Sequence, residues 1–150
     1  MIDDEYKKIL KQYHKLSDRH ILVVETDMPY SDVVKVVALS DKIRKAGNEL
    51  VGLMRRNYGQ LMRTKRYRKL LSLYGNTEEK TKRKDLAIQL NEMQKSYNVT
   101  WDYCRKAMIP VGKKYGIDAV FALTKAEDVW RGVEKCLYDN GKNLHFSKYE

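Results

Sequence analysis

Hydrophobic positions recur every three or four residues through most of this chain, which is the period of an amphipathic helix. The longest series runs from Val36 to Leu61 and predicts one helix over about 31–62, with Ser31 as its N-cap. The basic segment 63–74 is expected to continue as helix, with or without a bend, until Gly75 stops it.

Four further helices are predicted by the same spacing. They cover 3–16, 79–97 and 101–115, and a last one opens at the capping-box pattern Thr124–Glu127. Pro110 is expected to kink or end its helix, because proline lacks the amide that a helix interior needs. The residues expected inside the helical block are Val36, Leu39, Ile43, Leu50, Leu90, Trp101, Trp130 and Leu137.

A different pattern marks the two ends of this helical block. Residues 20–27 hold four consecutive aliphatic residues and predict a β-strand, and the alternating tail 143–149 predicts a second one. The expected fold class is therefore mainly α: a bundle of four to five helices with an amino-terminal strand and a carboxyl-terminal one. The expected division is an amino-terminal helix at 1–19, a strand segment at 20–30, a helical domain at 31–140 and a tail at 141–150.

Charge adds the strongest functional signal. The stretch from Leu50 to Thr77 has no acidic residue, and the whole chain has a formal net charge of +10. A polyanion relieves the repulsion within such a stretch and releases counterions as it binds, which favours nucleic acid as the partner. Tyr67 falls within the basic run and is the residue expected to stack on a base. The alternative reading is a basic helix face that is only solvated.

Residues for catalysis or metal binding are not evident. The sequence contains no Gly-rich phosphate loop, and Glu25 and Asp27 on the strand are more simply solvent-facing charges than part of a two-metal site. Cys104 and Cys136 are the only cysteines, are far apart, and are expected to be buried thiols. We therefore predict no catalytic residue, no metal and no cofactor. The amino terminus lacks an apolar signal core and no membrane span is evident, so a cytoplasmic protein is expected.

The order of parts resembles a known family. The strand is followed by a long helix with Ala46–Val51 and Arg55–Tyr58, then by a helix with Ala126–Lys135, then by the basic and aromatic tail Gly141–Tyr149. This is similar to the amino-terminal third of TnpB, the OrfB-type transposon protein related to type V CRISPR effectors. The resemblance covers about residues 20–150. It implies that the strands belong to a split wedge β-barrel and that the helices form an inserted recognition lobe.

The resemblance also implies partners. They would be guide RNA, the guide–target heteroduplex and target DNA, bound by a nucleic-acid module of an RNA-guided nuclease. The catalytic residues of that family would lie beyond position 150, so none is carried over. Unpaired barrel strands would favour self-association. The candidate nucleic-acid-binding residues are Arg55, Arg56, Arg63, Lys65, Arg66, Tyr67, Arg68 and Lys69, with Lys142 and Lys148 in the tail.

A second function of a different class stays open at this stage. The chain can be a self-contained helical protein-interaction or regulatory protein that uses its long apolar stripe against a partner helix. Salt dependence separates the two readings, because phosphate contacts weaken steeply with salt and an apolar groove does not.

Overall fold

The computed structural model describes residues 27, 29–139, 141 and 143–148. It divides into two compact units, Met1–Val33 and Val34–Glu150. Of the first unit, only residue 27 and the turn at 29–33 that opens the long helix are described. The predicted helix at 3–16 and nearly all of the predicted strand at 20–27 lie outside the described residues and stay predictions.

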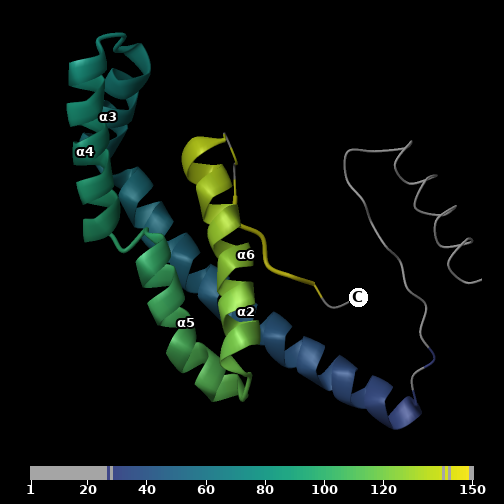
Figure 1. Ribbon diagram of the computed structural model, residues 1–150. Coiled ribbons are helices and arrows are strands. Elements are labelled where there is room, and N and C mark those ends of the chain that lie inside the picture. The colour runs from purple at the N-terminus through teal and green to yellow at the C-terminus, as the bar shows by residue number, and fades with distance from the viewer. Residues whose placement is uncertain (1–26, 28, 140, 142, 149–150) are drawn as a thin grey trace, which may run out of the picture. The chain divides into compact units, whose positions relative to one another are not determined.

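The described chain is helical, as expected. Five helices follow one another: α2 (Tyr30–Arg63), α3 (Lys65–Asn76), α4 (Lys80–Ser96), α5 (Trp101–Tyr115) and α6 (Ala119–Tyr138). Two antiparallel hairpins, α3–α4 and α5–α6, follow the long helix α2 (Figure 1). The expected helical bundle is confirmed in this part of the chain. The described tail residues, 143–148, have no regular secondary structure, so the strand predicted there is wrong for them.

Helix ends follow local chemistry, and three expectations need correction. The Pro29 carbonyl accepts the amides of Asp32 and Val33 (2.9 and 3.1 Å), so α2 begins before Ser31 and Ser31 is not its N-cap. Of the two outcomes expected at Pro110, an end of the helix is wrong: α5 continues to Tyr115, and the buried residues Met108 and Val111 hold the turns around Pro110 in the core.

The third correction concerns the proposed capping box. Helix α6 begins at Ala119, and Thr124 lies within it, donating its hydroxyl to the Val120 carbonyl (2.9 Å). The burial of Ala122 against Gly112 of α5 explains why the helix extends upstream, since a Cβ at Gly112 would lie 3.1 Å from that of Ala122. By contrast, the predicted bounds of α5 are confirmed, and Thr100 caps its start by accepting the Tyr103 amide on Oγ1 at 3.2 Å.

One continuous hydrophobic core joins all five helices of the described chain. Leu50 and Leu90 are buried as expected, and the other predicted core residues contact the core while partly buried: Leu39, Ile43, Trp101, Trp130 and Leu137. Val36 is the exception, with 53% of its surface exposed. Val34 and Val37 beside it are also about half exposed, so this part of α2 is not packed in the core.

Candidate nucleic-acid interface

The cationic residues singled out from the sequence all lie on the surface. Each of the seven between positions 55 and 69 is exposed, and so is Lys148; Lys142 lies outside the described residues. Within the described chain, none of the seven forms an ion pair with a carboxylate. These positive charges are therefore open to an external anion.

Thr64 divides the basic run into two sets. Its extended backbone (φ −71°, ψ 118°) separates α2 from α3, and its hydroxyl lies 3.2 Å from the Gln60 carbonyl oxygen and 3.0 Å from the Tyr97 hydroxyl. Arg63 is the last residue of α2, whereas Arg66 and Lys69 belong to α3, so these three cations, although three positions apart, do not lie on one helix.

The first set forms a groove along α2, which we call the arginine groove. It has a volume of about 500 Å³ and is lined by Gly52, Arg55, Arg56, Tyr58, Gly59, Gln60, Arg63 and Asn143. Apart from its chain neighbours and the backbone of its own helix, nothing lies within 4 Å of where a Cβ on Gly59 would be, so no side chain covers α2 at this point between the arginines. A phosphate can approach the helix closely at this point.

Tyr58 anchors this groove to the rest of the fold. Its hydroxyl donates to the Cys136 carbonyl oxygen on α6 at 3.2 Å, and burial raises the pKa of the Tyr58 hydroxyl. The contact fixes α2 against α6 immediately beneath the arginines. The guanidinium groups therefore project from a rigid base, which lowers the entropic cost of binding an anion.

The second set, Lys65, Arg66, Arg68 and Lys69, covers the outer face of α3 and is called the α3 cation set below. The inner face carries Tyr67 and Leu70, which are 1% and 7% exposed. The expected stacking role of Tyr67 is therefore wrong, because neither face of its ring is accessible. The spacing of Tyr67, Leu70 and Tyr74 by three and four residues is the core period, and it marked Tyr67 as inward-facing in the sequence.

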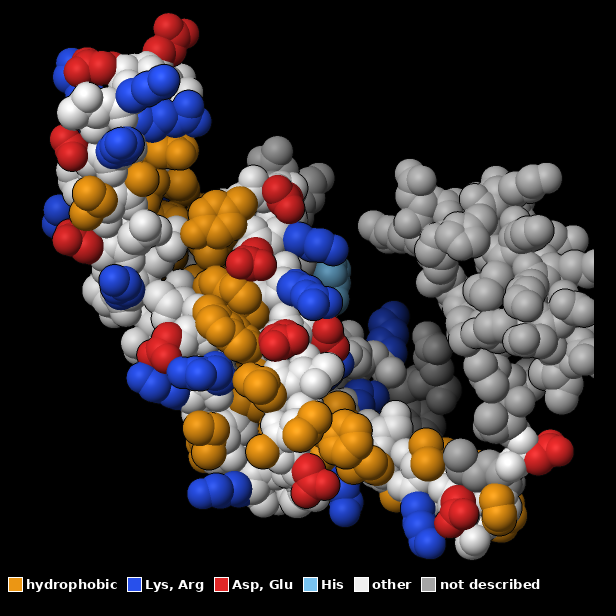
Figure 2. All heavy atoms as spheres, viewed as in Figure 1, with side chains coloured by type: hydrophobic (Ala, Val, Ile, Leu, Met, Phe, Trp, Pro, Cys, Tyr) orange, Lys and Arg blue, Asp and Glu red, His pale blue; other side chains and the backbone are white. Residues whose placement is uncertain are grey.

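Helix α4 places further cations beside α3, and none of them is among the candidate residues named from the sequence. Lys80, Lys82, Arg83 and Lys84 are exposed at its amino-terminal end. Lys82 pairs with Glu79 at 2.6 Å, and the guanidinium carbon of Arg83 lies 4.7 Å from the centroid of the Tyr74 ring. Figure 2 shows Lys and Arg side chains at the tip of the α3–α4 hairpin, with Asp and Glu side chains among them. Only the tertiary pairing of α3 with α4 reveals this extension of the basic surface.

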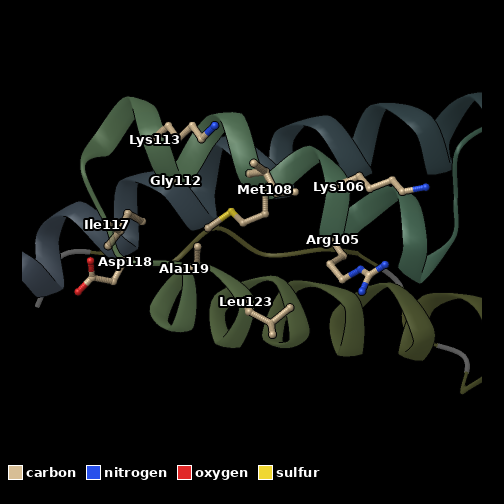
Figure 3. Close-up of a pocket in the computed structure, with 11 residues that line it drawn as sticks. Arg105, Lys106, Met108, Gly112, Lys113, Ile117, Asp118, Ala119 and Leu123 are labelled. Atoms are coloured by element: carbon tan, nitrogen blue, oxygen red, sulfur yellow. The ribbon is translucent and has the colours of Figure 1, made fainter.

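A second, chemically different hollow lies between α5 and α6 (Figure 3). Its volume is about 690 Å³, and Met108, Ala119 and Leu123 contribute apolar side chains to it, while Arg105, Lys106 and Lys113 stand around it. Arg105 and Lys106 both pair with Asp102, at 3.2 and 2.7 Å, so their charge is partly compensated. Figure 2 shows hydrophobic side chains along this pair of helices.

Comparison with known proteins gave no relatives: no protein-family model matches the chain, and neither the curated proteins nor the solved structures include a match. None of the five described helices combines the length and the apolar composition that crossing a membrane requires. The comparisons therefore add nothing on function, which has to be argued from the sequence and from the arrangement of side chains.

Proposed function

We propose that this protein binds nucleic acid by its sugar–phosphate backbone, through the arginine groove and the α3 cation set. The observation that carries the proposal is the exposure of seven cations between Arg55 and Lys69 with no carboxylate partner in the described chain. Like charges held this close destabilise the protein by itself, and phosphates relieve that cost.

Arginine is suited to the groove and lysine to the helix face beside it. The planar guanidinium of Arg56 or Arg63 can donate two parallel hydrogen bonds to one phosphate, which fixes its orientation. Lys65 and Lys69 lie one helical turn apart on α3 and act as point charges on successive phosphates. Such contacts position a nucleic acid without reading its sequence.

A narrower form of the proposal concerns the kind of nucleic acid. By its resemblance to TnpB, the chain would be the recognition-helix part of an RNA-guided nuclease and would bind guide RNA and a guide–target heteroduplex. The order of sequence segments and the helical character of residues 30–138 support this form. Backbone reading suits an A-form heteroduplex, which proteins recognise by shape and 2′-hydroxyl groups.

Binding to RNA, DNA and RNA–DNA hybrid hairpins of the same sequence at several salt concentrations tests both forms. We expect affinity to fall steeply with salt for all three, and the hybrid or RNA to bind more tightly than DNA. Binding that does not change with salt would overturn the general proposal. Equal affinity for DNA and hybrid would overturn only the narrower one.

The hollow between α5 and α6 favours a second candidate function, contact with another protein. Ile109 and Leu123 are 56% and 42% exposed on its two sides, which is unusual for aliphatic residues of a monomer when they gather around one hollow. A protein partner there would bind with little dependence on salt. Ile109→Ser and Leu123→Ser would weaken that contact and leave nucleic-acid affinity unchanged.

A further inference from the structure

Phe146 in the carboxyl-terminal tail is an aromatic residue held partly in solvent by a fixed backbone. Its side chain is 47% exposed, although the residues on both sides of it are anchored. Leu144 is buried at 6% exposure, and Ser147 is tied to Asn48 by two hydrogen bonds, one to its amide (2.7 Å) and one to its carbonyl oxygen (2.9 Å). The exposure of the ring therefore does not result from an unanchored tail.

The ring lies at the edge of the arginine groove. Its Cε1 atom is 3.9 Å from where a Cβ on Gly52 would be, and the guanidinium carbon of Arg55 is 5.7 Å from the ring centroid. Gly52 and Arg55 both line the groove, and Asn143 of the same tail forms part of its wall. The tail thus places one exposed aromatic ring beside Arg55, at the edge of the groove that Arg56 and Arg63 also line.

An aromatic ring next to phosphate-binding arginines is a stacking platform for a base. Every base has a π face, so stacking tolerates any sequence, and an adjacent guanidinium adds a cation–π contribution. A base within a continuous duplex already stacks on its neighbours and cannot reach such a ring without being unstacked. An unpaired base can reach it at no such cost.

We infer that Phe146 stacks on an unpaired nucleobase whose neighbouring phosphates occupy the arginine groove, so that this site takes a single-stranded or bulged segment and not a blunt duplex. The inference rests on the proposed function and deepens it. In the alternative, the ring has a purely structural role and only holds the tail against Gly52. The experiment must distinguish this role from base stacking.

The test uses the full chain and two hairpins, one with a single-stranded overhang carrying 2-aminopurine and one blunt, each made as RNA and as DNA. Phe146→Leu keeps an apolar contact with Gly52 but removes the π face, and Phe146→Tyr keeps both. Phe121→Leu is the matched control, because Phe121 is also exposed (42%) but belongs to α6, and no residue of α6 lines the groove. Amide exchange at Ser147 shows whether the tail stays in place.

We expect Phe146→Leu to weaken binding of the overhang hairpin by about 5- to 150-fold and to abolish the change in 2-aminopurine fluorescence. Affinity for the blunt hairpin and the salt slope should not change, and Phe146→Tyr and Phe121→Leu should behave like the wild type. A loss on the RNA or the DNA overhang supports the inference, and the larger loss identifies the source of the base.

Two results with Phe146→Leu would overturn the inference. One is an overhang affinity for Phe146→Leu within about twofold of the wild type, which is below the effect of losing one stacked base. The other is an equal loss on both hairpins, which would show that the ring only holds the tail. If Phe146→Leu detaches the tail, Phe146→Trp is used in its place. Its tryptophan fluorescence is compared with that of the wild type, which contains Trp101 and Trp130, before and after saturation with the overhang hairpin. If the fluorescence change on binding is the same in both proteins, no base stacks at position 146 and the inference is overturned. If the wild type binds neither hairpin, the proposed function fails as well.

Discussion

The side-chain amide of Gln94 donates a hydrogen bond to the hydroxyl oxygen of Tyr67 at 3.1 Å and so joins α4 to α3 within the core. The Tyr138 hydroxyl donates to the Gln94 oxygen at 3.2 Å, which satisfies the other end of the amide. Both Tyr67 and Gln94 are buried, and burial raises the pKa of the Tyr67 hydroxyl. Tyr67 thus fixes the helix that presents the α3 cation set, and it has no accessible face for a ligand.

Removing this hydroxyl should therefore affect stability and not binding. Tyr67→Phe leaves a buried amide donor of Gln94 without its acceptor and should lower the free energy of unfolding by about 1–3 kcal/mol. Tyr67→Ala should cost more, about 3–5 kcal/mol, because it also leaves a cavity. Urea denaturation measures both. Tyr74→Phe is the control, since no hydrogen bond of the Tyr74 hydroxyl is found in the described chain and the ring contact with Arg83 is kept, and it should stay within about 0.5 kcal/mol of the wild type. A folded Tyr67→Phe variant that no longer binds nucleic acid would contradict the structural role.

The tail should be released by one substitution on α2. Asn48→Ala removes both hydrogen bonds to Ser147, which span 99 residues of sequence. Because these bonds lie at the surface, we expect a modest loss of stability, about 0.5–1.5 kcal/mol, but much faster amide exchange at Ser147 and faster proteolysis of the tail. Asn91→Ala on the exposed face of α4 is the matched control and should change neither rate. Slow exchange at Ser147 in Asn48→Ala would show that the packing of Leu144 and Phe146 holds the tail without these hydrogen bonds.

Alkaline pH should destabilise the fold in a defined window. Burial raises the pKa of the Cys104 thiol to about 12 from an ordinary value of 9.0, and it also raises the pKa of the Cys136 thiol. In the unfolded chain the Cys104 thiol ionises near its ordinary value, while in the folded chain it stays protonated. The stability it contributes is therefore complete below about pH 9 and is lost as pH rises toward about 12.

Urea denaturation across this window measures the effect. We expect the free energy of unfolding to fall with rising pH in the wild type and to fall less steeply in Cys104→Ala. That variant starts from a lower stability at neutral pH because it removes a core side chain. The Cys104 thiol should also react slowly with thiol reagents near pH 8 until the protein unfolds. Equal slopes for the wild type and the variant would show that other groups, such as the lysines, govern the alkaline loss.

Helical periodicity predicted the elements well because most helix faces in the described chain are set by local spacing of apolar residues. The bounds of α5 and the turn at Gly116 (φ 64°) could be predicted since Thr100 and Gly116 act on their own helix. The start of α6 could not, because it depends on how closely Ala122 packs on Gly112 of another helix. The break at Thr64 likewise depends partly on Tyr97, which is 33 residues away.

The site was predictable to a similar degree. Charge alone identified the basic residues, because acidic residues are absent from the surrounding sequence. It could not separate the arginine groove from the α3 cation set, since a single extended residue divides them. It also could not place Phe146 beside Arg55, because that contact depends on a pair of hydrogen bonds between the tail and Asn48.

The two cationic surfaces can be tested separately, which bears most directly on function. Replacing Arg55, Arg56 and Arg63 by Gln removes charge from the arginine groove, and replacing Lys65, Arg66 and Lys69 by Gln removes it from α3. Each lost phosphate contact should reduce the slope of log affinity against log salt by about 0.7–0.9, so each triple variant should flatten it by about two units. Anisotropy titrations of a labelled RNA hairpin at several salt concentrations measure these slopes.

The matched control removes three positive charges from elsewhere on the same protein. Arg105, Lys106 and Lys113, all on α5, stand around the hollow between α5 and α6, and Gln at these positions lowers the net charge by the same amount. Because only close phosphate contacts release counterions, this variant should keep a slope close to that of the wild type. Equal flattening in all three variants would show that net charge and not the arrangement of the cations drives binding. If both test variants keep the wild-type slope, contact with another protein at the hollow between α5 and α6 would be the better explanation of the protein's function.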